Sequence, residues 1–183
     1  MSDFPVPTRD DVSEANGAIF ARLEKQLGFV PNLYATFAHS DNALASYLAL
    51  QGAKSSLSAR EKEVVNLVVS EVNDCDYCLA AHTAIGKMVG FDEAQVLEIR
   101  RGRAPFDEAL DALARFVRST VEARGKPGES ATAAFLAAGW TREQLVDVVV
   151  LIGEKTVTNY LHGVTGVAVD FPAAPALDAT RAA

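Results

Sequence analysis

Residues 71–82 read Glu71-Val-Asn-Asp-Cys-Asp-Tyr-Cys-Leu-Ala-Ala-His82 and contain both cysteines of the chain. If one of the two residues before Cys75 caps a helix, Cys75 falls in the first helical turn. Cys75, Cys78 and His82 are then spaced i, i+3 and i+7, so they share one face of the helix. Two thiols in this arrangement can close a reversible disulfide one turn from an imidazole.

Two opposing effects act on the ionisation of Cys75. The first turn of a helix offers free N–H groups and the positive end of the helix dipole, which favour the thiolate. Asp74 and Asp76 flank Cys75, and their negative charges would raise its pKa. The sequence leaves open which of these effects is larger.

The length and composition are those of an ordinary globular protein. The chain has 183 residues, of which 49% are hydrophobic and 22% are charged, and this is enough to bury a hydrophobic core. We expect a single domain over residues 1–183. Within it, residues 1–9 are expected to form an extended arm and residues 167–183 an extended C-terminal tail.

Charge and hydropathy argue against several classes of partner. The net charge is −7 and no dense run of Lys and Arg occurs, which argues against nucleic acid and anionic membranes. The N-terminus lacks the pattern of a signal peptide, and no apolar stretch reaches the roughly 18 residues of a membrane span. We therefore expect a cytoplasmic protein, in which two cysteines are more often catalytic or metal-binding than structural.

The segment that follows Ser58 predicts a buried central helix. Ser58 and Glu61 form a capping box, and residues 64–69 are rich in valine. A valine-rich run is also compatible with a buried strand, but the capping box and the length of about fourteen residues favour a helix. Its polar face, at i, i+3 and i+7, is formed by Glu63, Asn66 and Ser70. A helix that is apolar on nearly every other side is expected to be buried.

Helical periodicity continues through the rest of the chain, so we expect an all-α fold. The other helices are predicted at residues 10–27, 31–52 with a break at 39–42, 74–89, 92–101, 105–121, 130–138 and 141–162. We expect Arg100, Arg101 and Arg103 to form a solvated helix end. The tail is expected to pack through Phe171 at most.

Redox catalysis is the first interpretation of the cysteine motif. A C-x-x-C pair at a helix start can attack a peroxide or a partner disulfide and then resolve internally, while His82 takes the proton. A carboxylate is needed to orient His82. Glu63 and Glu71 are the candidates, and Glu63 can reach in from the neighbouring buried helix.

Two other interpretations stay open on the residues alone. In the first, Cys75, Cys78 and His82 supply three of the four ligands of a tetrahedral zinc ion. His162 or a carboxylate would then have to complete the site. In the second, the cysteines form a small buried pair and the histidine is a surface residue without a chemical role.

The pattern Glu63-x11-Cys75-x2-Cys78-x3-His82 resembles the motif of the alkylhydroperoxidase D / carboxymuconolactone decarboxylase family. Flanking phrases agree with it in order and resemble the peroxidase-related branch of that family. They are Gly28-Phe-Val-Pro-Asn-Leu-Tyr34, Ser58-Ala-Arg-Glu-Lys-Glu63, Asn159-Tyr-Leu-His-Gly-Val-Thr-Gly166 and Asp170-Phe-Pro172. The resemblance covers residues 15–175.

The resemblance implies a fold, an activity and partners. It implies an all-α fold that assembles into trimers or hexamers, and the uniformly apolar helices favour a homo-oligomer on physical grounds too. It also implies a peroxidase in which the cysteine pair cycles between dithiol and disulfide. The substrate is then a small hydroperoxide. No bound cofactor or metal is expected, because the electrons come from an external thiol or a protein reductant.

The same resemblance assigns roles to individual residues. Carried over residue by residue, the catalytic residues are Cys75, Cys78, His82 and Glu63. Glu71 is common in the peroxidase-related branch and could share or replace the role of Glu63. Tyr77 stands between the cysteines, where better-known members often have a histidine, and His162 is a further candidate for a supporting role.

Two alternative functions remain. One is a zinc-binding or redox-sensing oligomeric module. The other is a lyase similar to carboxymuconolactone decarboxylase that uses His82 and Glu63 as acid–base groups. Decarboxylase members of the family usually lack the cysteine pair, so its presence favours redox chemistry.

Overall fold

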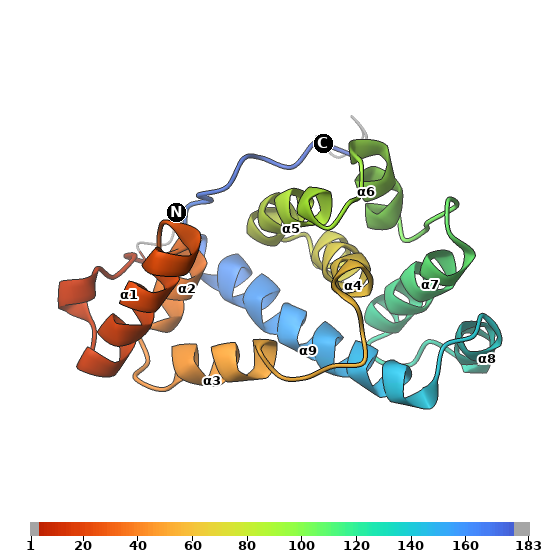
Figure 1. Cartoon of the computed structure of the whole chain (residues 1–183), viewed down its shortest axis with the longest axis horizontal. Helices are drawn as coiled ribbons and strands as arrows, with labels where there is room; N and C mark the ends of the chain where they lie inside the picture. Colours follow the sequence, from red (N-terminus) through yellow and green to blue (C-terminus); the bar gives the residue numbers. More distant parts are fainter. Residues whose placement is uncertain (1–3, 178–183) are drawn as a thin grey trace.

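A computed structural model describes residues 4–177, and this part of the chain is all-helical without a β-strand (Figure 1). The elements are η1 (Arg9–Asp11), α1 (Glu14–Leu27), α2 (Asn32–Phe37), α3 (Ala43–Gln51), α4 (Ala59–Val72), α5 (Asp76–Met88), α6 (Glu93–Arg100), α7 (Glu108–Glu122), α8 (Glu129–Ala137) and α9 (Arg142–Thr165). The expected all-α fold is confirmed. The ends of the predicted arm and tail, residues 1–3 and 178–183, lie outside the described residues.

Helix α4 is the buried centre of the molecule. It packs against α5, α6, α7 and α9, which surround it in Figure 1. The predicted capping box of Ser58 and Glu61 is present, and residues 64–69 are all buried. The face formed by Glu63, Asn66 and Ser70 is also buried. These polar groups therefore point at neighbouring helices, where burial requires them to find partners.

Only residues 73–75 separate α4 from the cysteine helix α5. Asp74 has a φ of 55°, a left-handed conformation that Asp tolerates better than most residues and that reverses the chain. The prediction that Cys75 lies in the first turn was off by one position. Cys75 is the N-cap residue itself, because its Sγ accepts a hydrogen bond from the backbone N–H of Cys78.

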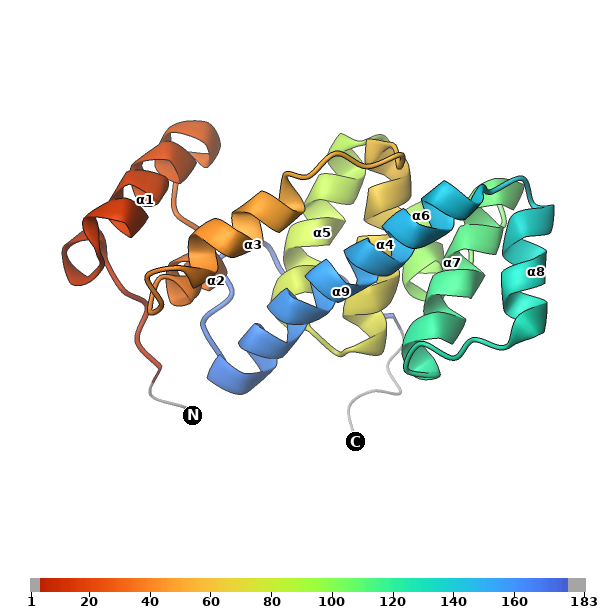
Figure 2. The ribbon, with the colours of Figure 1, turned by 90° about the horizontal axis from the view of Figure 1, so that it is seen from below.

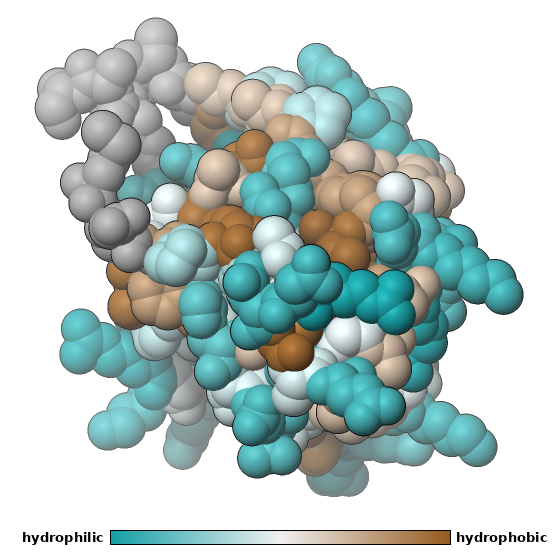
Figure 3. All heavy atoms as spheres, turned by 90° about the vertical axis from the view of Figure 1, so that its left-hand side faces the viewer, coloured by the Kyte–Doolittle hydropathy of each residue, from teal (hydrophilic) through white to brown (hydrophobic). Residues whose placement is uncertain are grey.

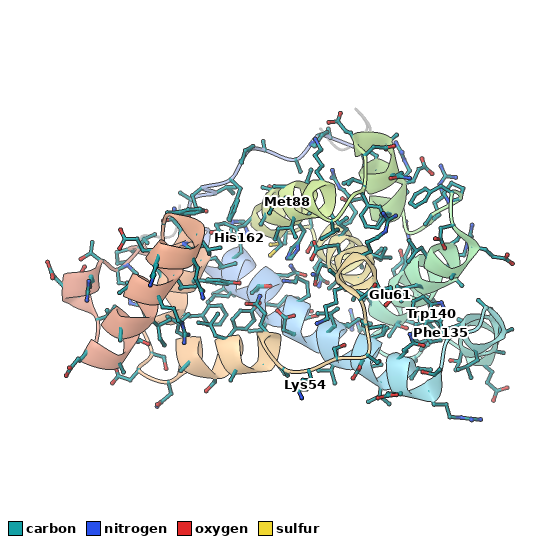
Figure 4. All side chains as sticks on the ribbon, viewed as in Figure 1. Lys54, Glu61, Met88, Phe135, Trp140 and His162 are labelled. Carbon is teal, nitrogen blue, oxygen red and sulfur yellow. The ribbon has the colours of Figure 1, made fainter. Side chains whose placement is uncertain are left out.

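Helix α9 crosses beneath α4 and α5, as the second view shows (Figure 2). It extends three residues past the predicted end at His162, to Thr165, and Gly166 closes it in the left-handed conformation. At its start, Trp140 stacks on Phe135 with ring centroids 5.3 Å apart (Figure 4). This contact fixes the angle at which α9 leaves α8.

Two expectations about the middle of the chain were wrong. Helix α7 begins at Glu108 rather than at Pro105, because Asp107 caps it by accepting a hydrogen bond from Leu110 N. Arg100 is not solvated: it is 4% exposed. Its Nε donates to Glu71 Oε2 at 2.8 Å, so it pairs with α4 in the interior.

The C-terminal tail packs further than predicted. After α9 it runs past α5 toward α6 (Figure 1). Asp170 accepts a hydrogen bond from Asn32 N at 2.7 Å, and Arg100 Nη1 donates to Pro175 O at 2.6 Å. Arg101 Nη2 donates to Leu177 O at 3.0 Å. Guanidinium groups of α6 therefore hold the tail beyond Phe171.

The end of the molecule formed by the N-terminal helices presents a mixed surface. Figure 3 shows this face, on which hydrophilic side chains separate small hydrophobic areas. Among residues 4–177, no helix combines the length and the apolar character that crossing a bilayer requires.

Candidate active site

Glu63 and His82 form a buried pair between α4 and α5. Glu63 Oε2 lies 2.7 Å from His82 Nδ1, and the two residues are 6% and 8% exposed. Asn66 Nδ2 donates a hydrogen bond to the other carboxylate oxygen, Glu63 Oε1, at 2.8 Å. When the imidazole is neutral, Nδ1–H donates to Glu63, so Nε2 carries the lone pair that can accept a proton.

Electrostatics keep Glu63 ionised in this position. Burial, the largest single effect, raises the pKa of Glu63. The charge and hydrogen bond of His82, the hydrogen bond of Asn66 and the charge of Lys155 lower it, and together they outweigh burial. The net result is a pKa below the ordinary value of 4.5. Glu63 is therefore a carboxylate at neutral pH and can hold the imidazole in one orientation.

Cys75 and Cys78 are both free thiols, and both are buried. The Cys75 thiol hydrogen-bonds to the sulfur of Cys78, while Asn159 and Thr158 of α9 lie beside Cys75 and Cys78, respectively, and lower their pKa values. The pair therefore sits between the start of α5 and the C-terminal half of α9.

The two thiols share one proton unequally. The hydrogen bond from Cys75 is the largest cause that lowers the pKa of Cys78, to about 5. Burial opposes this shift, and the charges of Lys155 and His82 support it. The pKa of Cys75 is raised, mainly by its hydrogen bond to Cys78 and by burial. Cys78 is thus the thiolate of the pair and Cys75 keeps its proton.

A cavity of about 220 Å³ reaches the acid–base pair from solvent. Glu63, Asn66 and His82 line it together with Glu154 and Lys155 of α9. Its other walls mix apolar side chains, including Leu50, Ile85, Val150 and Leu151, with polar and charged ones. The cysteines do not line it, so a molecule that enters the cavity reaches the imidazole of His82 before it reaches the sulfur atoms.

Glu71 belongs to a different buried pair. Its carboxylate binds Arg100, as described above, and it is Glu63 that contacts His82. The structure therefore separates the two candidate acids: Glu63 faces the site, whereas Glu71 joins α4 to α6.

Tyr77 and His162 are not among the residues that line the cavity. The Tyr77 hydroxyl accepts a hydrogen bond from Leu33 N at 3.2 Å, and its ring lies 5.6 Å from that of Phe171. His162 packs against Tyr77 at 5.6 Å between ring centroids. In Figure 4, His162 lies well apart from Lys54, which lines the cavity. Both residues thus pack between α5, α9 and the tail.

Within residues 4–177, no three His, Cys, Asp or Glu side chains converge in a way that could hold a metal ion.

The segment that carries the site is similar to a known protein family. Residues 31–118, which contain the whole Glu63–His82 and cysteine arrangement, match the carboxymuconolactone decarboxylase family. This segment belongs to the carboxymuconolactone decarboxylase family. The match confirms the resemblance seen in the sequence. No curated protein sequence matches the chain.

Solved structures with the same fold extend the similarity beyond the carboxymuconolactone decarboxylase segment. A peroxidase-related protein with an alkylhydroperoxidase AhpD core, from Ralstonia eutropha JMP134, superposes with a TM-score of 0.82 at 21% identity and covers 92% of each chain. A peroxidase-related protein from Silicibacter sp. TM1040 gives 0.78 at 24% identity, covering 91% of this chain and 89% of the other. A debrominase in complex with 2,3,4-tribromopyrrole gives 0.76 at 14% identity, with 93% and 92% covered. These identities show a shared fold.

Two residues of α9 that line the cavity, Glu154 and Lys155, were missed in the sequence because local spacing does not predict which helix α9 packs against. Lys155 is 2% exposed, and its Nζ lies 3.7 Å from Glu154 Oε1. The Tyr47 hydroxyl donates a short hydrogen bond to the same Glu154 oxygen. A visible signal did exist: Glu154 and Lys155 follow the apolar run 148–152 in the middle of a predicted helix. Charges at such positions must be buried with partners.

Proposed function

We propose that this protein is a thiol-dependent peroxidase that reduces small organic hydroperoxides through a Cys75–Cys78 disulfide. The observation that carries the proposal is the 2.7 Å contact between Glu63 and His82, one turn from a buried pair of free thiols on the same helix. The arrangement supplies a nucleophile, a resolving thiol and an oriented base, which is what such a reaction requires.

The first step uses the Cys78 thiolate. Its sulfur attacks one oxygen of the hydroperoxide ROOH, the O–O bond breaks, and the alkoxide leaves. The alkoxide takes a proton from protonated His82 and departs as the alcohol, while Cys78 becomes a sulfenic acid. Glu63 stabilises the imidazolium before the proton is transferred and restores the same tautomer afterwards.

The second step closes the disulfide. His82 Nε2 accepts the proton of Cys75, the Cys75 sulfur attacks the Cys78 sulfur, and the S–O bond of the sulfenic acid breaks. The leaving hydroxide takes that proton back from His82 and departs as water. The peroxide has then gained two electrons and the two thiols have lost them. An external dithiol or a reductant protein returns the electrons by thiol–disulfide exchange. A compartment with a reducing thiol pool, such as the cytoplasm, suits this cycle.

Access to the sulfur atoms requires a local movement. Cys78 is 2% exposed and does not line the cavity, so the first turn of α5 has to open locally during the cycle. The cavity volume of about 220 Å³ suits a compact organic hydroperoxide better than a bulky one, and the apolar part of the wall can contact its alkyl group.

A steady-state peroxide assay tests this proposal. The chain, Cys78→Ser, Cys75→Ser and His82→Ala are each supplied with a dithiol and with several organic hydroperoxides, and peroxide consumption is followed. We expect Cys78→Ser to abolish turnover and His82→Ala to lower it by about 100-fold. Full turnover in either variant would remove the proposed mechanism.

The same proteins discriminate the alternatives. About one zinc per chain in untreated protein would favour a metal-binding module. Activity that survives the loss of both thiols would favour a lyase that uses Glu63 and His82. Because a debrominase shares the fold, a brominated pyrrole is included as a second oxidant.

A further inference from the structure

We propose that the C-terminal tail, residues 167–177, is a removable cover over Cys75 and Cys78, and that a dithiol reductant reaches their disulfide from this side. The inference rests on the proposed function, because it names the face of α5 at which the oxidised pair is reduced. The hydroperoxide and the reductant then approach α5 from different sides, the first through the cavity beside His82 and the second at the tail.

The tail closes the hydrophobic cluster that contains the two cysteines. Val167 is 3% exposed, and Phe171 packs against the same cluster. The buried members of this cluster are Leu33, Cys75, Tyr77, Cys78 and Val167. Neither cysteine lines the cavity beside His82. A molecule that must touch sulfur therefore has to enter the cluster, and the tail forms part of the cluster's outer wall.

Few contacts hold the first part of the tail, and Asn32 makes two of them. Its backbone N–H donates to Asp170 Oδ2 at 2.7 Å, and its Nδ2 donates to Ala168 O at 3.1 Å. Pro31 offers no side-chain cap at the start of α2, so Asp170 takes that role. Within the described part of the chain, no backbone–backbone hydrogen bond joins the tail to another element. Such a segment can separate while the helices beneath it stay folded.

A hollow of about 680 Å³ lies between the tail and the start of α5. Asp74 and Asp76, which flank Cys75, line it from one side, and Phe171 and Pro175 line it from the tail. The tail therefore bridges this space on its way past α5 (Figure 1). Because Phe171 lines the hollow and also packs against the cysteine cluster, its displacement would join the two. The guanidinium groups of α6 described above would still hold the far end of the tail.

Reduction of the disulfide requires direct access of this kind. A thiolate of the reductant attacks one sulfur of the Cys75–Cys78 disulfide, a mixed disulfide forms, and the other cysteine leaves as a thiolate. The second thiol of the reductant then attacks the reductant sulfur in the mixed disulfide and releases the remaining cysteine. The reductant has become a disulfide, and its two electrons and two protons have passed to the cysteine pair. The attacking sulfur must touch a cysteine sulfur, whereas Cys75 and Cys78 are 1% and 2% exposed.

Thiol labelling of the reduced chain tests the cover without any peroxide. Asp170→Ala removes the hydrogen bond to Asn32 N, and we expect monobromobimane to label the cysteines about 10-fold faster or more. Asp147→Ala is the matched control, because Asp147 lines the cavity and holds the loop beside it by accepting a hydrogen bond from Ser56 N at 2.6 Å. This variant should leave the labelling rate unchanged.

Phe171→Ala covers the case in which Asp170→Ala does not fold. It removes the ring that lies 5.6 Å from that of Tyr77 and leaves the start of α2 intact. Labelling should again be faster, and its rate should depend only weakly on low urea concentrations, because a local opening exposes little surface. Faster labelling in Asp147→Ala but not in the folded tail variants would place the route through the cavity and overturn the proposal. A strong urea dependence would also overturn it, because the reagent would then enter by global unfolding.

The reduction step is measured on the same proteins after diamide has oxidised the cysteine pair to the disulfide. Dithiothreitol is added and the return of free thiols is followed. We expect reduction to be faster in both tail variants than in the parent and unchanged in Asp147→Ala. Equal reduction rates in the parent and the tail variants would overturn the proposal. Because no peroxide is used, the cover can be disproved while peroxidase activity is found, or supported while no peroxide is reduced.

Discussion

At the scale of single residues, the site depends on which carboxylate holds His82. Glu63 is 2.7 Å from the imidazole, while Glu71 is 2.8 Å from Arg100. Both acids lie on the same predicted helix, so either one was a plausible partner of His82 from the sequence alone. Their partners separate them: Glu63 acts on the imidazole and Glu71 on a guanidinium that lies outside the site.

A pair of matched variants tests this division. Glu63→Gln should lower peroxide turnover by about 10-fold or more, because a neutral amide no longer stabilises the imidazolium. Glu71→Gln should lower stability but leave the turnover of the folded protein close to that of the parent. The measurement is the initial rate per folded chain at fixed peroxide and dithiol. Equal losses in both variants would show that Glu63 has no special role.

The pH dependence follows from the same residues. The pKa of Cys78 is lowered to about 5, and the pKa of Glu63 lies below 4.5. As pH falls through about 5, the thiolate is protonated while Glu63 is still charged, so the rate constant for peroxide attack should fall there. Above about pH 6 it should stop rising, because the thiolate is already formed and the leaving alkoxide needs the proton of His82, whereas an ordinary thiol gains reactivity up to about pH 8.5. A stopped-flow pH profile of the first oxidation decides this, and a rate that keeps rising to pH 9 would contradict it.

At this scale, spacing in the sequence was enough to propose four site residues. Cys75, Cys78 and His82 share one helix face, and the reversal between α4 and α5 brings Glu63 to His82. Lys155 is more than seventy residues further along the chain. Nothing local to α5 predicts that α9 crosses it, so only the tertiary packing places Lys155 in the cavity lining with His82.

At the scale of elements, Arg100 joins three parts of the chain. It stands at the end of α6, binds Glu71 of α4, and donates to the carbonyl of Pro175 in the tail. The sequence favoured a solvated helix end because three arginines occur close together there. Arg101 and Arg103 do pair with Glu98 at the partly exposed surface, so the prediction failed for the one residue that finds a buried carboxylate.

Removal of the Arg100 guanidinium should destabilise the folded protein. Arg100→Met leaves Glu71 buried without its cation, and we expect the free energy of unfolding to fall by about 3 kcal/mol. The double variant Arg100→Met with Glu71→Leu should recover part of this loss, because neither charge is then buried alone. Urea unfolding followed by circular dichroism measures both. If the double variant loses as much unfolding free energy as the two single variants added together, the Arg100–Glu71 interaction does not cause the loss.

Element boundaries were predictable where capping was visible in the sequence. Ser58 with Glu61 and Thr141 with Gln144 both form capping boxes where helices were predicted to begin. The start of α7 was missed because Pro105 is a plausible first residue and Asp107 is a better cap. Cys75 was missed as a cap because a thiol is an uncommon acceptor there.

At the scale of the whole molecule, α9 leaves one apolar stripe uncovered. Val146, Val149, Val150, Val157, Tyr160 and Val164 are between 45% and 77% exposed and recur at helical spacing on one side of the helix. A stripe of this length is unusual on a monomer. We propose that a second copy of the chain covers it, in the homo-oligomer expected from the sequence.

A charge placed in the stripe should break this assembly. Val157→Glu is expected to lower the mass in solution from a trimer or hexamer to a single chain, because the interface would have to bury a carboxylate. Leu27→Glu on α1 changes an equally exposed side chain outside the stripe and serves as the control. Analytical ultracentrifugation measures both. A monomeric parent protein, or a Val157→Glu variant with unchanged mass, would rule out this interface.

The most informative experiment is a single-turnover thiol count. The fully reduced chain is mixed with one molar equivalent of an organic hydroperoxide, quenched, denatured and titrated for free thiols, and its mass is recorded. We expect both thiols to disappear with the loss of two hydrogens, and His82→Ala to do so more slowly. Two intact thiols in a folded chain, with the peroxide unconsumed, would show that the Glu63–His82 pair does not drive peroxide chemistry at these cysteines.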